Sequence, residues 1–185
     1  MGSPRRATYA DLDRTPEGDG NVYELLDGVL YSSPRPRGLH GRAQAELLRM
    51  LEQALRHHSD ELADSWFFEV EPELRLAGDA LVPDLAAWRA PVPPLGPQGY
   101  ATTPPPWVCE VLSPRNFRLD WSRKLPMYFR HGVRHVWFVD IRAQELHVLD
   151  RLGGEKHVGA VLVSPAPFDV PLDLGRFWER LQTQH

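Results

Sequence analysis

The chain has 185 residues, 42% hydrophobic and 25% charged, which is typical of a globular protein with its own core. No apolar run approaches the roughly 20 residues of a membrane helix and the first residues are polar, so we expect neither a membrane span nor a signal peptide. The single cysteine excludes an internal disulfide and a cysteine-rich zinc site, which suits the cytoplasm. The net charge is −4, so a polyanionic ligand would need a local basic patch.

The first third of the chain predicts a short helix, a hairpin and a long helix. We expect the short helix at 8–13. The stretch VYELLDGVLY at 22–31 is typical of a hairpin, because two apolar runs are joined by Asp27 and Gly28, which suit a type I′ turn. Apolar residues then recur at helical spacing over 39–58, and three basic residues close that helix with charges that favour its dipole.

The middle of the chain predicts strands. The stretch WFFEVEPELRL indicates two strands split by Pro72, and LVPDLAAW indicates a third strand at 81–88. Residues 91–106 are rich in proline and glycine and predict a surface loop. The stretch WVCEVL that follows predicts a buried strand with Glu110 in its middle.

The last third predicts a helix at about 117–130, strands at 134–140 and 144–149, and a short C-terminal helix within LDLGRFWERL. Helices and strands therefore occur in mixed order along the chain. This order predicts the α+β (mixed α/β) class, with a central mixed sheet flanked by helices in one domain over residues 1–185.

Three acidic residues lie within the apolar strands: Glu24, Asp84 and Glu110. A buried ionised carboxylate is costly unless a cation or a set of hydrogen-bond donors compensates it. An arginine or backbone N–H groups would explain any one of them, and that interpretation stays open. Three in a chain of this size favour a shared partner, and a hard divalent cation such as Mg²⁺ is the economical one, since it takes one or two carboxylates plus water.

Lys124 is the candidate basic residue of this group. It lies on the predicted helix, four residues after Asp120 and four before Tyr128. One interpretation is a solvated lysine paired with Asp120. The other is a functional lysine, because arginine supplies nearly all the positive charge of the chain, and Lys156 is the one other lysine. A lysine offers a compact charge that can exchange a proton.

Several of these stretches together resemble the Uma2 family (DUF820), described as restriction-endonuclease-like with the PD-(D/E)XK nuclease fold. They are YELLDG, VPDLAAW, PPWVCEVLSP, the run from Lys124 to Tyr128, and HGVRHVWFVD. They follow the family order, and the similarity runs from about Thr8 to Leu149. The resemblance implies an αβββαβ restriction-endonuclease-like core with flanking helices.

The resemblance also implies roles for four residues. Asp84 and Glu110 would hold Mg²⁺ or Mn²⁺, Glu24 would be an auxiliary acid, and Lys124 would be the catalytic lysine. The general nuclease pattern has its lysine two residues after the second acid, and Leu112 stands at that position here. The resemblance therefore implies a migrated lysine, which the following helix offers to the site.

His40 and Tyr128 are candidate accessory residues, although packing or helix capping is the favoured role for His40. Cys109 points away from Glu110 and is read as a small buried hydrophobic residue. A group of arginines would contact substrate phosphates or form an ordinary solvated surface, and both interpretations stay open. They are Arg35, Arg37, Arg42, Arg115, Arg118 and Arg123.

The favoured function is a Mg²⁺-dependent nuclease that hydrolyses phosphodiester bonds of nucleic acid, with DNA favoured as substrate and a homodimer left open. The alternative is a catalytically inactive nuclease-fold protein that binds nucleic acid or serves assembly, which the net charge and Leu112 keep open. A third hypothesis is a glycosidase with Asp84 and Glu110 as acid and base. It leaves Glu24 and Lys124 without a role.

Overall fold

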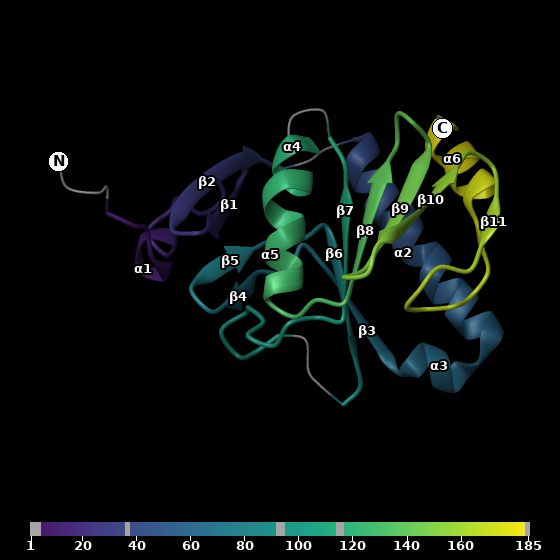
Figure 1. Ribbon diagram of the computed structural model, residues 1–185, viewed down its shortest axis with the longest axis horizontal. Helices are drawn as coiled ribbons and strands as arrows, with labels where there is room; N and C mark the ends of the chain where they lie inside the picture. The colour runs from purple at the N-terminus through teal and green to yellow at the C-terminus, as the bar shows by residue number, and fades with distance from the viewer. Residues whose placement is uncertain (1–4, 36–37, 92–94, 114–116, 184–185) are drawn as a thin grey trace.

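The computed structural model of the protein describes residues 5–35, 38–91, 95–113 and 117–183 (Figure 1). The helices are α1 (Tyr9–Leu12), α2 (Leu39–His58), α3 (Asp60–Asp64), α4 (Phe117–Leu119), the π-helical turn η1 (Asp120–Lys124), α5 (Leu125–Arg130) and α6 (Leu174–Gln182). The strands are β1 (Asn21–Leu26), β2 (Val29–Pro34), β3 (Trp66–Val70), β4 (Leu74–Leu76), β5 (Asp79–Leu81), β6 (Leu85–Arg89), β7 (Trp107–Val111), β8 (His135–Asp140), β9 (Glu145–Leu149), β10 (Gly154–Val158), β11 (Leu162–Val163) and β12 (Leu172–Asp173). In the described chain no helix is both long and apolar enough to cross a membrane.

The strands form a large mixed sheet and a smaller antiparallel sheet. The large sheet has the order β10-β9-β8-β7-β6-β3, in which β7 and β8 are parallel and all other neighbours are antiparallel. The smaller sheet has the order β2-β1-β5-β4, and β11 pairs with β12 separately. A mixed sheet with helices beside it confirms the predicted α+β class.

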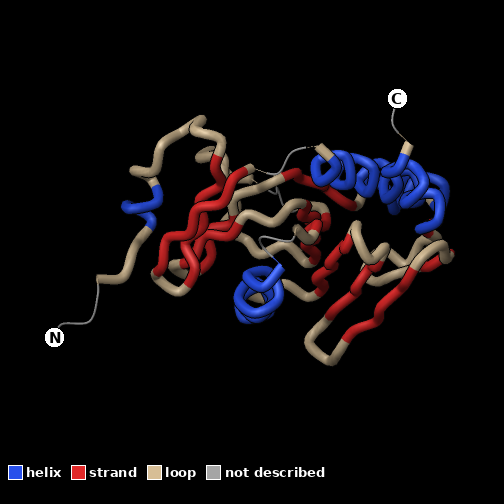
Figure 2. Tube along the Cα trace, turned by 90° about the horizontal axis from the view of Figure 1, so that it is seen from above, coloured by secondary structure: helices blue, strands red, loops and turns tan. Residues whose placement is uncertain are grey.

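Helices cover both faces of the large sheet, as Figures 1 and 2 show, with α2 and α6 on one side and α5 on the other. Strand alternation explains this arrangement. The paired residues Leu85 and Cys109 pack with the buried residues of α2 and α6. The next pair, Ala86 and Val108, packs with the buried residues of α5 on the opposite face. The strands are therefore apolar on both faces, and a charged residue in them stands out.

The predicted hairpin is confirmed as β1 and β2. Asp27 and Gly28 both have positive φ, at 52° and 76°, as the two central residues of a type I′ turn require. Glu24 pairs with Tyr31, as the position of the turn predicts. β1 also pairs with β5, which brings Glu24 beside the chain that leaves β5 at Val82.

A buried aspartate fixes the small sheet against the end of α5. The Asp79 carboxylate accepts the Asp27 N–H at 2.7 Å, and it contacts Arg130 and His131 at 2.8 Å each. Asp79 is 6% exposed, so its carboxylate is largely shielded from water, while Arg130 is half-exposed. They hold the turn of the hairpin, and with it β1, at a defined position relative to the helical run that carries Lys124.

The strand predicted at 81–88 is wrong in one respect, because it is two strands in two sheets. β5 ends at Leu81 and β6 begins at Leu85. Pro83 lies between them and cannot donate a hydrogen bond to a ladder, so the chain leaves the small sheet there and enters the large one. Asp84 consequently lies at the entrance of β6 and not inside a strand.

The helix predicted at 117–130 is a continuous helical run with a wide turn in its middle. α4 leads into η1, where the Leu125 N–H bonds to the Asp120 carbonyl five residues back, and α5 follows. Pro126, in the first turn of α5, has no N–H to continue an α-helical ladder across this point. π-helical turns of this kind occur frequently at functional sites.

Candidate active site

A small pocket lies where η1 meets the ends of both sheets. It encloses about 40 Å³, which is room for an ion and a few water molecules and too little for a nucleotide base. Most of its lining side chains are polar or charged. The lining residues are Val22, Glu24, Ser33, His40, Glu71, Val82, Asp84, Glu110, Val111, Asp120 and Lys124.

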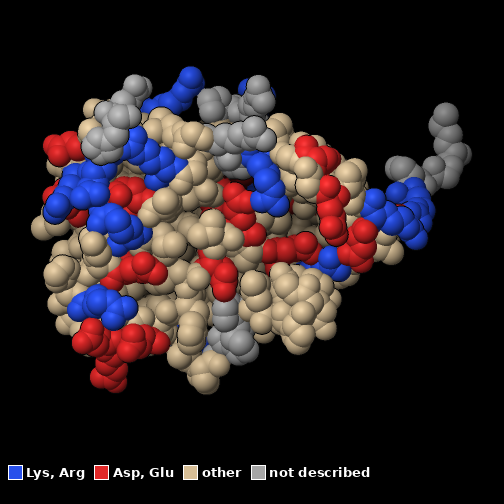
Figure 3. Space-filling model, turned by 180° about the vertical axis from the view of Figure 1, so that it is seen from behind, with Lys and Arg blue, Asp and Glu red and all other residues tan. Residues whose placement is uncertain are grey.

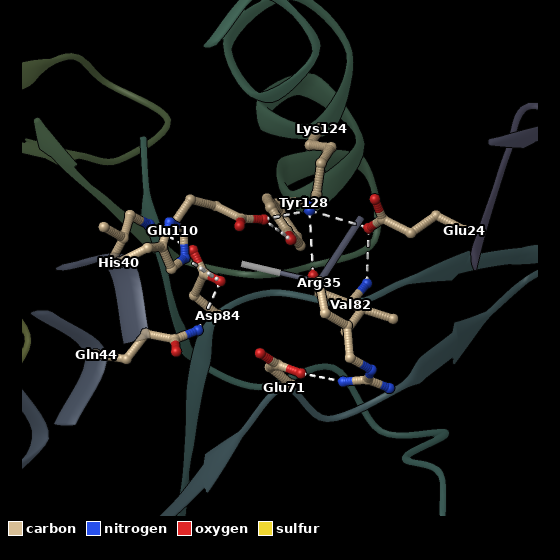
Figure 4. A network of polar contacts seen from close by, with 11 residues as sticks. Glu24, Arg35, His40, Gln44, Glu71, Val82, Asp84, Glu110, Lys124 and Tyr128 are labelled. Carbon is tan, nitrogen blue, oxygen red and sulfur yellow. Dashed lines mark hydrogen bonds and ion pairs between the residues drawn. The ribbon is translucent and has the colours of Figure 1, made fainter. Parts of the chain in front are cut away.

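Lys124 reaches into this pocket from the helical run, as Figure 4 shows. Its ammonium lies 2.6 Å from Glu110 Oε1, 2.9 Å from Glu24 Oε1 and 3.2 Å from the Val82 carbonyl oxygen. The interpretation of Lys124 as a solvated lysine is wrong, since the residue is 3% exposed. Burial works to lower the pKa of Lys124, but the charges of Glu110 and Glu24 outweigh it and hold the pKa well above its ordinary value.

Glu110 lies on β7, and one of its two carboxylate oxygens makes two polar contacts. Its Oε1 contacts the Lys124 ammonium and accepts the Tyr128 hydroxyl at 2.5 Å. Burial raises the pKa of Glu110 well above its ordinary value, and Lys124 opposes that rise. Among the described residues, no hydrogen bond or ion pair is made by Oε2, so this oxygen is free to bind a ligand in the pocket.

Asp84 is held by α2 and by the neighbouring strand. Its Oδ1 accepts the Gln44 amide at 2.7 Å and contacts His40 Nε2 at 2.9 Å, while Oδ2 accepts the Val111 N–H at 2.6 Å. His40, for which packing or capping is the favoured role, therefore contacts a predicted metal ligand, and the N-cap of α2 is Gly38. Gln44 was missed by the sequence analysis, although a polar residue next to Ala43 on an inward helix face was a usable signal.

Asp84 and Glu110 lie at neighbouring strands, because β6 pairs with β7 in the register Leu85 to Cys109. Their free lone pairs are hard oxygen donors of the kind that Mg²⁺ and Mn²⁺ bind. Within the described ranges, no three His, Cys, Asp or Glu side chains are grouped as a complete metal site. Two carboxylates completed by water and a substrate oxygen suit Mg²⁺, so the residues present fit the ion that the sequence predicts.

Glu24 anchors the other side of the lysine. Its Oε1 accepts the Val82 N–H at 2.8 Å in addition to its contact with Lys124. β1 supplies Glu24, β7 supplies Glu110 and the link between the two sheets supplies Val82, so three separate parts of the chain meet at the ammonium that η1 supplies.

Asp120 is a pocket residue that the sequence analysis considered only as a surface partner for Lys124. It is 4% exposed and lies in η1. Burial is the main cause that raises the pKa of Asp120 to about 7, against the opposing effect of Lys124. Its position four residues before Lys124, on the same side of the helical run, was the signal that could have placed it in the site.

Four of the six arginines that the sequence analysis names as candidate phosphate contacts lie within the described residues. Arg35 is bound by Glu71 in an ion pair at the pocket mouth, and Figure 4 shows this pair across the pocket from Lys124. Arg118 and Arg123 are exposed on the helical run, Arg42 is exposed on α2, and Arg37 and Arg115 lie outside the described residues. On the face in Figure 3, acidic side chains cross the middle, and most basic ones lie toward α2 and α6.

Cys109 is fully buried on the face of β7 opposite Glu110 and packs in the core under α2. Burial raises the pKa of the Cys109 thiol well above its ordinary value. Both observations agree with the interpretation of Cys109 as a small hydrophobic residue.

A mixed sheet between helices, with acids at the adjoining ends of neighbouring strands, defines the restriction-endonuclease-like class of fold. The model of the Uma2 family, described as "Putative restriction endonuclease", matches residues 7–181. The chain therefore belongs to the Uma2 family. The match extends past the stretch from Thr8 to Leu149 on which the sequence resemblance rests.

The fold is also similar to a solved structure from Anabaena variabilis, described as "a putative nuclease belonging to DUF820". The superposition has a TM-score of 0.76 at 20% sequence identity, and it covers 94% of this chain and 98% of that one. Among curated proteins, none matches this chain.

Proposed function

We propose that this protein is a Mg²⁺- or Mn²⁺-dependent nuclease that hydrolyses phosphodiester bonds, with DNA as the favoured substrate. The observation that carries the proposal is the buried ammonium of Lys124 at 2.6 Å from Glu110. Leu112, which stands where the general pattern has lysine, is 7% exposed and packs in the core beside α5. We therefore propose that the helix supplies the lysine that this chemistry needs, as Lys124.

Asp84 and Glu110 would hold the ion, which when bound supplies a Lewis acid for the scissile phosphate and a water of lowered pKa. The other residues set the geometry. His40 and Gln44 fix the orientation of Asp84, and Tyr128 fixes that of Glu110, in the way that outer hydrogen bonds orient metal ligands. Lys124 orients the attacking water or stabilises the negative charge that develops on the phosphate.

The substrate would approach the pocket from outside, because the pocket itself is too small for a base or a sugar. Exposed Arg118 and Arg123 are proposed phosphate contacts from the helical run. Arg35 would join them on leaving Glu71, and Arg37 and Arg115 are proposed from the sequence alone. A charge-assisted contact between arginine and a phosphate is favoured by the planar donor geometry of arginine.

The proposal is tested by incubating the purified protein with supercoiled plasmid, short DNA duplexes and RNA, each with Mg²⁺, with Mn²⁺ and with EDTA. We expect cleavage with either ion, none with EDTA, and none for Asp84→Asn. Asp60→Asn is the matched control, since Asp60 is an exposed carboxylate on α3. Cleavage that survives both EDTA and Asp84→Asn would contradict the metal-nuclease proposal.

A nuclease fold that only binds nucleic acid is the second candidate, and one observation favours it. Lys124 already compensates Glu110 and Glu24, so the acids are paired in the absence of a cation. In that case nucleic acid would bind without turnover under any metal condition. The glycosidase hypothesis gains nothing from the structure, because Glu24 and Lys124 are integral to the arrangement around Glu110.

A further inference from the structure

The Asp120 carboxylate is an unusual group among the buried acids of the pocket. Glu24, Asp84 and Glu110 each accept at least one hydrogen bond. Asp120 is as deeply buried, at 4% exposed, and lines the same pocket. Yet among the described residues no hydrogen bond or ion pair reaches its side chain. Its carboxylate lines the pocket without a donor from the described residues, so it is available as an acceptor to a donor that moves within the pocket.

The ammonium of Lys124 is a donor that lines the same pocket as Asp120. Its three N–H groups are used by Glu110, Glu24 and Val82. Lys124 is also the cation with the largest influence on the pKa of Asp120, so the two charges lie near one another. They stand four residues apart on one helical run, with the acid first, which is the favourable order for a helical ion pair. A rotation about the side-chain bonds of Lys124 would be enough to exchange acceptors.

A divalent cation supplies the reason for such an exchange. The Lys124 ammonium lies 2.6 Å from Glu110, a proposed ligand of that cation. A cation bound to Glu110 would repel the ammonium at close range in a site shielded from water, where charges interact strongly. It would also take over the compensation of Glu110, which Lys124 provides in the metal-free protein.

We infer that Asp120 is the second acceptor of the Lys124 ammonium and receives it when a divalent cation binds Asp84 and Glu110. Asp120 is thus a positioning residue that acts through Lys124. Because Asp120 lines the same pocket, the ammonium stays in the pocket and keeps N–H groups for water or a phosphate oxygen. The inference rests on the proposed function in one respect, which is the binding of the cation.

The chain offers a direct spectroscopic test, because it contains only two lysines, Lys124 and Lys156. Protein labelled with ¹³C and ¹⁵N in lysine alone gives two sets of side-chain signals, and Lys156→Arg assigns them. Lys156 is 51% exposed in its side chain and pairs with Glu145, so it serves as an internal control. The signals are followed during titration with Mg²⁺, and calorimetry measures the affinity for the same ion.

We expect the chemical shifts of Lys124 to change in proportion to the fraction of protein with bound Mg²⁺, as calculated from the calorimetric affinity. The chemical shifts of Lys156 should stay unchanged. Asp120→Asn should abolish the change at Lys124 and weaken Mg²⁺ binding about 10- to 100-fold, as loss of a supporting group does. Asp120→Glu keeps the carboxylate and should restore part of both effects. Asp60→Asn, which removes an exposed carboxylate, should change neither.

The outcomes separate the inference from the proposed function. Absence of Mg²⁺ and Mn²⁺ binding to the unaltered protein would overturn both. Binding that leaves the Lys124 signals unmoved, or moves them equally in Asp120→Asn, would overturn the inference alone. Should the variants not fold, a crystal structure with Mn²⁺ decides: Nζ of Lys124 within hydrogen-bond distance of Asp120 supports the exchange, and Nζ still on Glu110 refutes it.

Discussion

The ammonium of Lys124 is buried, at 3% exposed, so its charge needs compensation within the protein. Two carboxylates, those of Glu110 and Glu24, provide it. Removal of one partner from a buried ion pair costs about 3–5 kcal/mol, because the remaining charge is left without compensation.

Asp120 should lower the stability of the metal-free protein at high pH. Its folded-state pKa of about 7 is raised above the ordinary value of 3.8, so the folded protein holds the proton more tightly than the unfolded chain. The neutral carboxyl therefore contributes its full share to the free energy of unfolding below about pH 4, and this share is lost as the pH rises toward 7. We expect Asp120→Asn to be more stable than the unaltered protein at pH 8, by roughly 2–4 kcal/mol, and little different at pH 4.

Urea unfolding at a series of pH values measures this difference. Asp60→Asn is again the control, because an exposed carboxylate should give no such profile. A stability difference that is the same at pH 4 and pH 8 would show that Asp120 is not held as a buried acid. A group that costs stability in the resting protein is expected where function requires it.

The π-helical turn η1 places Asp120 and Lys124, and Pro126 directly follows it. We expect Pro126→Ala to favour a regular α-helical ladder, because it restores an N–H in the first turn of α5. The Lys124 side chain would then leave the helix in a different direction relative to Glu110. The variant should unfold at the same or a higher temperature and yet cleave more slowly.

Thermal unfolding and cleavage rates, measured on the same preparation, test this expectation. Pro97→Ala is a matched control for the replacement itself, since Pro97 is an exposed proline in the loop between β6 and β7. Full activity in Pro126→Ala would show that the wide turn is not needed to place the lysine.

Much of the element order could be predicted because the decisive signals are local. Asp27 and Gly28 fix the hairpin turn, and the apolar spacing of α2 fixes that helix over Leu39–His58. β10 was missed because its residues, Gly154–Val158, are mostly exposed and show no apolar alternation. The short α3 was missed as well, since its five residues bury none of their side chains.

The sequence predicts the residues of the site better than it predicts the contacts between them. Glu24, Asp84, Glu110 and Lys124 line one pocket as the sequence suggests. Sequence alone could not reveal which acceptors Lys124 chooses, since Glu24 and Asp120 are equally plausible until the two sheets are placed. The contact of Gln44 with Asp84 depends on how α2 crosses the sheet, which is a tertiary property.

At the scale of the whole molecule, the net charge of −4 opposes a polyanion, so binding must rest on local basic residues. We expect the double variant Arg118→Ala, Arg123→Ala to bind DNA more weakly than the unaltered protein. The slope of log K against log salt should decrease by about 0.9 for each phosphate contact removed. Fluorescence anisotropy with a labelled duplex measures both quantities across a series of salt concentrations.

Arg56→Ala is the matched control for this pair. Arg56 is exposed near the C-terminal end of α2, sixteen residues from His40, which at the rise of a helix is about 24 Å away. An equal loss of affinity and salt slope in Arg56→Ala would mean that DNA follows a different face of the molecule.

The most direct test of the migrated lysine is the single-turnover rate of plasmid cleavage at saturating Mg²⁺ for Lys124→Met beside Lys156→Met. The comparison is made at a temperature where circular dichroism shows both variants folded, since loss of the buried ammonium reduces stability. We predict that Lys124→Met loses cleavage by at least about 100-fold, as removal of a transition-state donor does, while Lys156→Met keeps the rate of the unaltered protein. Cleavage by folded Lys124→Met at the rate of Lys156→Met would contradict the account.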